Sequence, residues 1–182
     1  MNITVSINEV LRDILGRFQL IYEKYYEEVK SDVVTPDLMQ YIHFSADTEL
    51  YDFLYEEAPM EIFGQAKESE NNVIRHLVEL YKKMPSDYKL TLVTDDFGRS
   101  KASTLWFLAK YGCCCDEIKI YNINTVKTIW DYSDVVITAD KEIISCKPEN
   151  KKLIVVDRVF NQEVTSDKRI NNLKEIESFE NI

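Results

Sequence analysis

The sequence predicts an α/β protein with a three-layer, Rossmann-like parallel sheet of five strands. In the second half of the chain, short apolar strands alternate with helical segments, a pattern that is typical of parallel sheets with right-handed crossovers. A long stretch with helical periodicity separates the first predicted strand from the second. We therefore expect an α/β core of residues 1–13 and 86–182, and a helical insertion of residues 14–85 after the first strand.

The first part of the chain predicts one strand followed by helices. Residues 2–7 are short and rich in β-branched side chains, which favours a strand. Apolar residues then recur every three or four positions from Val10 to Val29, which indicates a helix. Pro36 and Pro59 each suit the first turn of a helix, and residues 71–84 carry an apolar face. We expect no strand between residues 36 and 84.

The second part supplies the other four strands. Gly112 is expected to end one of the intervening helices, and Ser166 or Asp167 can cap a terminal helix. The predicted strands are residues 89–94, 117–121, 134–138 and 152–157, and the predicted helices are residues 100–111, 126–132, 141–145 and 167–179.

Composition narrows the class of protein. The 182 residues carry a formal net charge of -10, which argues against nucleic acid as the main partner, because phosphate binding needs clustered Lys and Arg. There are four glycines and neither a dinucleotide-binding fingerprint nor a phosphate-binding loop motif. No apolar run approaches the roughly 18 residues of a membrane helix, and no signal peptide is visible. We expect a cytoplasmic protein that is neither secreted nor membrane-bound.

The cysteines and histidines do not form a metal-binding pattern. Cys113, Cys114 and Cys115 are consecutive, Cys146 is distant, and the only histidines are His43 and His76. Because no CxxC spacing occurs, we expect no zinc site and reduced thiols. The three consecutive cysteines are expected to enter a buried strand as small apolar residues. No cofactor is expected.

Several segments at the ends of the predicted strands resemble motifs of one enzyme family. A strand and short polar turn precede Val10-Leu11-Arg12-Asp13, Leu92-Val93-Thr94 ends a strand, and Lys101 begins the next helix. Ser133 to Asp140 and Leu153 to Asn161 are two further strands with polar ends. In this order they resemble the motifs of haloacid dehalogenase-like (HAD) hydrolases of the 5′-nucleotidase-like branch. The resemblance implies that the helical insertion is a cap domain.

The resemblance also places catalytic residues at positions where this chain has others. The family opening, D-x-D-G-V-L-x-D, has its nucleophile where this chain has Ser6, its general acid/base where it has Asn8, and its glycine where it has Glu9. The paired acids of the fourth motif are replaced by Thr138-Ala139. We therefore expect no catalytic residues, with Thr94 and Lys101 retained as phosphate-binding residues.

The main functional hypothesis is a catalytically degenerate HAD-like pseudoenzyme. It would serve as a structural or protein-interaction module, with a protein partner or self-assembly. Glu61-Ile62-Phe63-Gly64 and the surrounding insertion also resemble small HAD-like proteins of bacterial viruses, which implies a viral structural or accessory protein. The aromatic clusters Tyr22-Tyr25-Tyr26 and Tyr51-Phe53-Tyr55 are either the core of the insertion or an interface.

The alternative is an active or rewired Mg²⁺-dependent phosphatase of the 5′-nucleotidase type that acts on a small phosphate ester. Its cation would need carboxylate oxygens from a rearranged set of residues. Asp95 and Asp140 are the candidate metal ligands, with Glu9 as a third.

Overall fold

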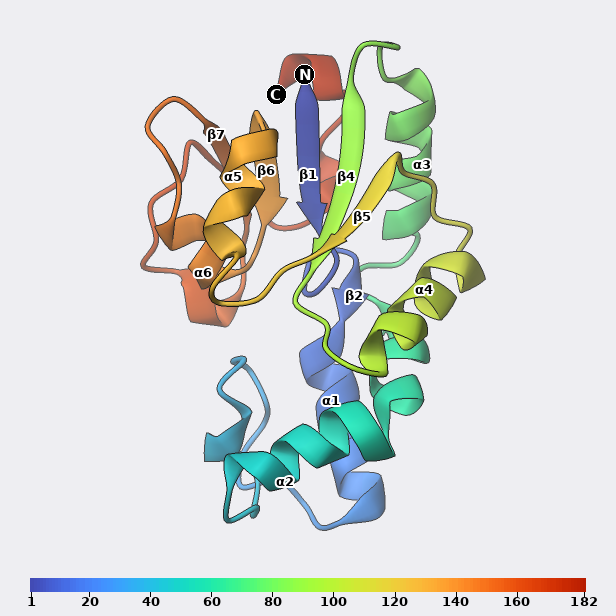
Figure 1. Cartoon of the computed structure of the whole chain (residues 1–182), viewed down its shortest axis with the longest axis vertical. Coiled ribbons are helices and arrows are strands. Elements are labelled where there is room, and N and C mark those ends of the chain that lie inside the picture. The colour runs from blue at the N-terminus through green and yellow to red at the C-terminus, as the bar shows by residue number, and fades with distance from the viewer. The chain divides into compact units, whose positions relative to one another are not determined.

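The computed structural model describes all 182 residues, which form two compact units (Figure 1). The first unit comprises residues 1–12, 68–95 and 111–182, and the second comprises residues 13–67 and 96–110. The expected limits of the core and of the insertion stay a prediction.

A sheet of six parallel strands forms the centre of the first unit, in the order β5-β4-β1-β6-β7-β8. The predicted α/β class with a parallel sheet is confirmed, but the predicted number of five strands is wrong. The central strand β1 has β4 on one side and β6 on the other, so the strand order reverses there. The strands are β1 (Asn2–Ser6), β4 (Lys89–Thr94), β5 (Glu117–Ile120), β6 (Val135–Thr138), β7 (Lys152–Val156) and β8 (Lys168–Ile170).

The sixth strand, β8, lies where the sequence predicted a terminal helix over residues 167–179. It pairs with β7, and the Asp157 N–H extends the pairing by donating to the Ile170 carbonyl at 2.8 Å. The following residues form two 3₁₀ turns, η6 (Leu173–Glu175) and η7 (Phe179–Asn181). Buried apolar residues recur every three positions, at 170, 173, 176 and 179, which resembles the periodicity of an amphipathic helix. The side chains of Asn172 and Ser178 each cap a separate short turn, so no continuous helix forms.

Both faces of the central strands of this sheet carry buried apolar side chains, as in other parallel sheets that are covered on both sides. On one face, Val93, Val136 and Val155 pack against the helices α5 (Ile129–Tyr132) and α6 (Lys141–Ser145), which lie in front of β6 in Figure 1. The strand register puts other residues on the opposite face: Val5, Leu92, Ile137 and Ile154.

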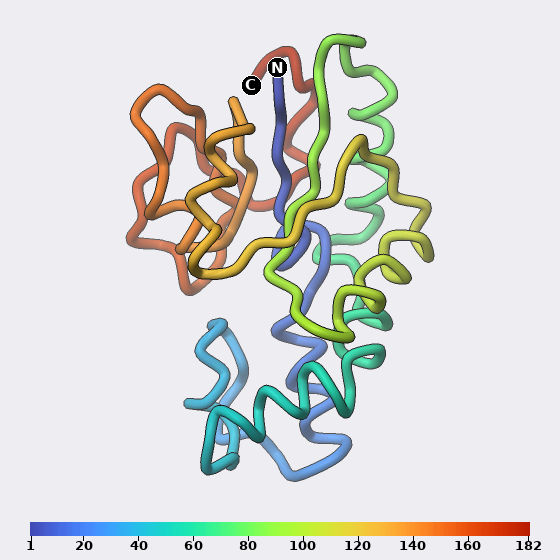
Figure 2. Tube along the Cα trace, viewed as in Figure 1, coloured from blue at the N-terminus to red at the C-terminus, as the bar shows by residue number.

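Helix α3 (Val73–Lys83) also belongs to the first unit. It buries Val73, Ile74, Leu77 and Leu80 on one face, as its sequence pattern predicts. Its His76 Nε2 lies 2.8 Å from the carbonyl oxygen of Ile176. Helix α3 thus contacts η6 in the C-terminal segment, and Figure 2 traces the path of the chain through both.

The second unit is helical. Asp13 begins α1 by accepting a hydrogen bond from the Gly16 N–H at 3.0 Å, so the helix starts later than the predicted Val10. The residues after Pro36 form only the 3₁₀ turn η1, and two consecutive segments, η2 and η3, are π-helical turns. The elements are α1 (Ile14–Tyr25), η1 (Leu38–Gln40), α2 (Asp47–Asp52), η2 (Phe53–Glu57), η3 (Met60–Gly64) and α4 (Ser100–Lys110).

Three further observations bear on the sequence predictions. The short strands β2 (Arg12–Asp13) and β3 (Lys67–Glu68) pair with each other, so the expectation of no strand between residues 36 and 84 is wrong. Residues 113–115 lie in the loop before β5 rather than in a buried strand, because the strand begins only at Glu117. None of the helices combines the length and apolar character needed to cross a membrane.

Two aspartates fix strand ends in the first unit and predict acid-sensitive stability. Asp134 accepts the Asn2 N–H at 2.8 Å, and Asp167 accepts the Leu153 N–H at 2.7 Å. These backbone hydrogen bonds, aided by Lys151 and Lys147, lower the pKa of each carboxyl below its ordinary value of 3.8. The stabilisation is therefore complete above pH 3.8 and is lost as the pH falls through the lowered pKa values.

We expect the double variant Asp134→Asn and Asp167→Asn to unfold at lower urea concentration than the wild type at pH 7. This difference should shrink as the pH falls below 3.8, which urea titrations followed by circular dichroism at several pH values would measure. Asp131→Asn, an exposed substitution on α5, is the control. A difference that stays constant from pH 7 to pH 2 would contradict the prediction.

Candidate functional site

The candidate site is the edge of the large sheet at the carboxyl ends of its strands, within the first unit. In open α/β sheets, ligands bind at this edge where the strand order reverses, which here is between β1 and β6. The polar residues that end or directly follow β1, β4, β6 and β7 gather at this edge. They are Ser6, Asn8, Glu9, Thr94, Asp95, Thr138, Asp140, Asp157 and Arg158.

At the point of reversal, two hydroxyl groups bind each other. The Ser6 Oγ donates to the Thr138 Oγ1 at 2.6 Å, and both residues are buried. The Thr138 Oγ1 also accepts the Asp140 N–H at 3.0 Å. The proton of Ser6 is thus directed to another hydroxyl group rather than to a base, and a serine nucleophile needs a base within hydrogen-bonding reach.

The turn after β1 is organised around a fully buried arginine. The Arg12 Nε and Nη2 both donate to the Asn8 Oδ1, at 3.0 and 2.5 Å. The Asn8 Nδ2 in turn donates to the Asp95 Oδ1 at 2.7 Å. The amide of Asn8 therefore links a buried cation to an exposed carboxylate. Arg12 cannot be singled out from the sequence, since an arginine after a short strand has no distinguishing pattern.

The turn after β7 holds the turn after β1 in place. The Arg158 Nη2 donates to the Glu9 carbonyl at 2.5 Å, and its Nε lies 3.8 Å from the Glu9 carboxylate. Asn161, which is fully buried, donates to the Ala139 and Val156 carbonyls at 3.1 and 3.0 Å. These contacts tie three strand ends together through side chains that the sequence analysis did not assign a role.

The candidate metal ligands are held by other groups. Asp140 caps α6 by accepting the Glu142 N–H at 2.8 Å and also accepts the Tyr121 hydroxyl. Asp95 is bound by Asn8, as described, and Glu9 by Arg158. Nowhere in the chain do three His, Cys, Asp or Glu side chains come together so as to hold a metal ion. Mg²⁺ needs near-octahedral oxygen ligands, and the side chains at this edge do not fit that requirement.

The two expected phosphate-binding residues have different environments. Thr94 ends β4 in the first unit, is almost completely buried, and its Oγ1 is the one buried side-chain oxygen or nitrogen without a hydrogen-bond partner. Lys101 belongs to α4 in the second unit, where it is exposed and its Nζ lies 5.9 Å from the centre of the Phe97 ring. Buried hydroxyls without a partner are rare, and Thr94 is the one buried side chain at the sheet edge that has an unsatisfied polar atom.

Two of the four cysteines have thiols with a raised pKa. All four are free thiols. Burial and the neighbouring cysteines raise the pKa of Cys113 to about 12. Burial and Asp116 raise the pKa of Cys115 to about 11. Because the thiolate is the reactive form, these two thiols are unreactive at neutral pH.

Comparison with known proteins matches the chain to no family model and to no curated protein. The resemblance to HAD-like hydrolases therefore rests on the sequence motifs alone.

The hydrogen-bonded chain from Arg12 to Asp95 predicts a stability effect of Asn8. Asn8→Ala removes the oxygen that accepts two N–H groups of the buried Arg12, which costs about 1–3 kcal/mol. Urea unfolding should show this loss in the free energy of unfolding. Asn124→Ala changes the same side chain at an exposed loop position and is the matched control. Equal unfolding free energies for Asn8→Ala and the wild type would contradict this account of the turn.

Proposed function

We propose that this chain is a catalytically inactive HAD-like protein that serves as a structural or protein-interaction module. The observation that carries the proposal is the hydrogen bonding at the sheet edge. Where the resemblance requires a nucleophile and a general acid/base, Ser6 binds Thr138 and Asn8 is held between Arg12 and Asp95. These groups stabilise the edge, and neither Ser6 nor Asn8 has the carboxylate that the family chemistry needs at its position.

The backbone after β1 also supports the proposed relationship. The family opening has a glycine at the position of Glu9, and Glu9 adopts a positive φ of 60°. This left-handed conformation is one that glycine adopts without strain and that other residues rarely adopt. A glutamate in a conformation suited to glycine is what a degenerate form of this motif would contain.

The exposed aromatic side chains of the second unit support the interaction role. Tyr22 and Phe53 are buried core residues, whereas Tyr51, Phe97 and Trp106 are 39%, 53% and 44% exposed. The rings of Tyr51 and Phe97 lie 5.4 Å apart and thus form a small continuous apolar surface. Aromatic residues are enriched in protein interfaces, and exposed apolar patches often mark binding sites.

One observation favours the alternative of a phosphate-ester ligand. The unpartnered Thr94 hydroxyl lies at the position where the resemblance places a phosphate-binding residue. A bound phosphate oxygen would satisfy it. The alternative Mg²⁺-dependent phosphatase would further need free carboxylates, whereas Asp95 and Asp140 already accept hydrogen bonds from Asn8 and Tyr121.

A phosphate-release screen on nucleoside monophosphates with Mg²⁺ separates these functions. We expect no Mg²⁺-dependent release by the wild type, because its nucleophile and acid/base positions hold Ser6 and Asn8. The variant with Ser6→Asp and Asn8→Asp restores both carboxylates and is expected to gain measurable release. Wild-type release that disappears in Asp95→Ala or Asp140→Ala would contradict the proposal and support the phosphatase. Circular dichroism of each variant controls for folding.

A further inference from the structure

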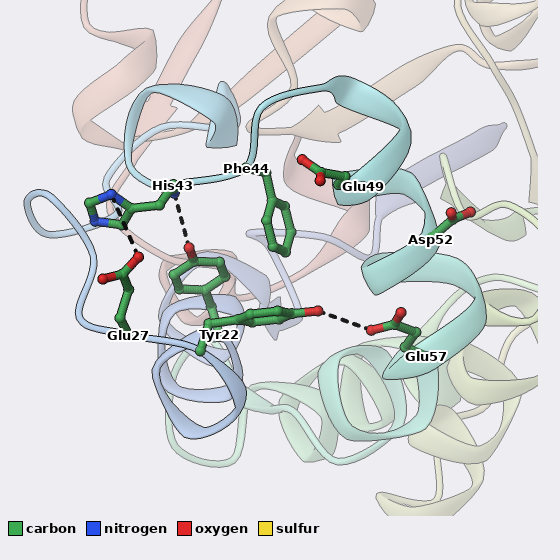
Figure 3. A pocket seen from close by; sticks show the side chains of 8 residues that line it. Tyr22, Glu27, His43, Phe44, Glu49, Asp52 and Glu57 are labelled. Carbon is green, nitrogen blue, oxygen red and sulfur yellow. Dashed lines mark hydrogen bonds and ion pairs between the residues drawn. The ribbon is translucent and has the colours of Figure 1, made fainter.

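The second unit contains a pocket of about 350 Å³, a volume within the range of roughly 300–1,000 Å³ that is usual for small-molecule sites (Figure 3). It lies beside the end of α1, the segment around residue 43, and the turns of α2 and η2. We call it the acidic aromatic pocket. Its lining residues are Tyr22, Tyr26, Glu27, His43, Phe44, Glu49, Asp52 and Glu57.

The inner wall of this pocket is a group of packed aromatic rings. Tyr22 and Tyr26 stack with their centres 5.2 Å apart, and Phe44 meets them edge-on at 5.3 and 4.9 Å. The Tyr22 hydroxyl accepts the His43 N–H at 2.9 Å, which fixes one ring to the loop. Tyr22 is almost completely buried, while Tyr26 is 47% exposed. Ring faces and edges of this kind pack against alkyl chains and attract cations.

The remaining lining residues are strongly acidic. Four of the eight are carboxylates, and neither lysine nor arginine is among them. Glu57 accepts the Tyr26 hydroxyl at 3.1 Å, and Glu27 lies 3.8 Å from the His43 Nδ1. Asp52, in contrast, has no side-chain hydrogen bond or ion pair. Glu49 accepts the backbone N–H groups of Ser45 and Ala46 at 2.6 and 3.2 Å. No Lys or Arg of the lining offsets the four carboxylates, so the charge of the pocket lining is negative.

The pKa of Tyr26 is consistent with the negative charge of the pocket lining. The pKa of Tyr26 is raised, first by burial of the ring, then by the hydrogen bond to Glu57, and further by the nearby charges of Glu57 and Glu49. Ionisation of the Tyr26 hydroxyl is disfavoured because it would place a negative charge next to carboxylates.

The carboxylates are distributed around the rings rather than gathered at one point. Figure 3 shows Glu27 on one side of Tyr22, and Glu49, Asp52 and Glu57 on the other side. No three of them come close enough to bind one metal ion. A compact cation would therefore interact with the carboxylates on one side of the rings only. An extended ligand with positive ends and an apolar middle would meet both sides and the rings between them.

We infer that the acidic aromatic pocket binds a linear organic ion with two or more ammonium groups. Its methylene chain packs on Tyr26 and Phe44, and its ammonium groups donate hydrogen bonds to Glu27 at one end and to Glu49, Asp52 or Glu57 at the other. The site lies wholly within the second unit, and the inference does not rest on the function proposed for the sheet edge.

Isothermal titration calorimetry on the whole chain tests this inference with 1,4-diaminobutane and spermidine, in about 0.15 M salt to screen non-specific attraction. We expect saturable binding of one ligand per chain. Butylamine has a similar alkyl chain and a single ammonium group, so it should bind about tenfold more weakly, the effect of losing one charge-assisted hydrogen bond. Tetramethylammonium, which is compact, should also bind more weakly.

Two matched variants locate the site. Glu57→Gln should weaken diamine binding by about tenfold. Glu56→Gln, the same change at the neighbouring residue, which faces Arg99 and does not line the pocket, should leave it unchanged. Phe44→Leu should weaken binding through the loss of ring contact. If this variant fails to fold, ligand-induced NMR shifts of the Tyr22 and Tyr26 rings in the wild-type protein show whether the ligand binds beside these rings.

Three outcomes would overturn the inference. The first is no saturable binding of either polyammonium ion at millimolar concentration. The second is an equal loss of affinity in Glu56→Gln and Glu57→Gln, which would show attraction to the net charge of -10 rather than to a site. The third is equal affinity for butylamine and 1,4-diaminobutane, which would exclude the requirement for two ammonium groups.

Discussion

The buried charge of Arg12 is the constraint on which the polar edge of the sheet depends. A guanidinium removed from water must find acceptors within the protein, and Asn8 supplies one oxygen to two of its N–H groups. That contact fixes the turn after β1, and Arg158 holds the same turn from β7 through the carbonyl of Glu9. The polar residues of the sheet edge thus take part in a structural network, so a substitution among them would also change the stability of the fold.

The strands that form the centre of the sheet could be predicted because each is a short apolar run between polar turns. The strand β8 could not, since Ile170, Leu173, Ile176 and Phe179 recur with a helix-like spacing while local caps at Asn172 and Ser178 divide the segment. The cysteines at 113–115 were misplaced for a related reason. Their small apolar side chains suit a strand, and only the pairing of β5 with β4 shows where that strand begins.

The candidate residues at the sheet edge could be predicted as a group, because the carboxyl ends of parallel strands meet at one edge. Their partners could not. Tyr121 binds Asp140 across 19 positions and Asn161 binds Ala139 across 22, and no local pattern encodes such pairs. The acidic aromatic pocket was missed for a different reason: its tyrosines were considered as core or interface, without the glutamates that lie among them in the same helices and turns.

The left-handed backbone of Glu9 shows how the path of a turn can constrain the residues that occupy it. Side chains at a catalytic turn can be replaced one at a time, but the path of the main chain is fixed by every neighbour that packs on it. The conformation of a turn can therefore be retained after the catalytic side chains on it have been replaced. In such a protein, the backbone conformation of the turn changes more slowly than its side chains. A distant relationship is then easier to detect from backbone geometry than from sequence motifs.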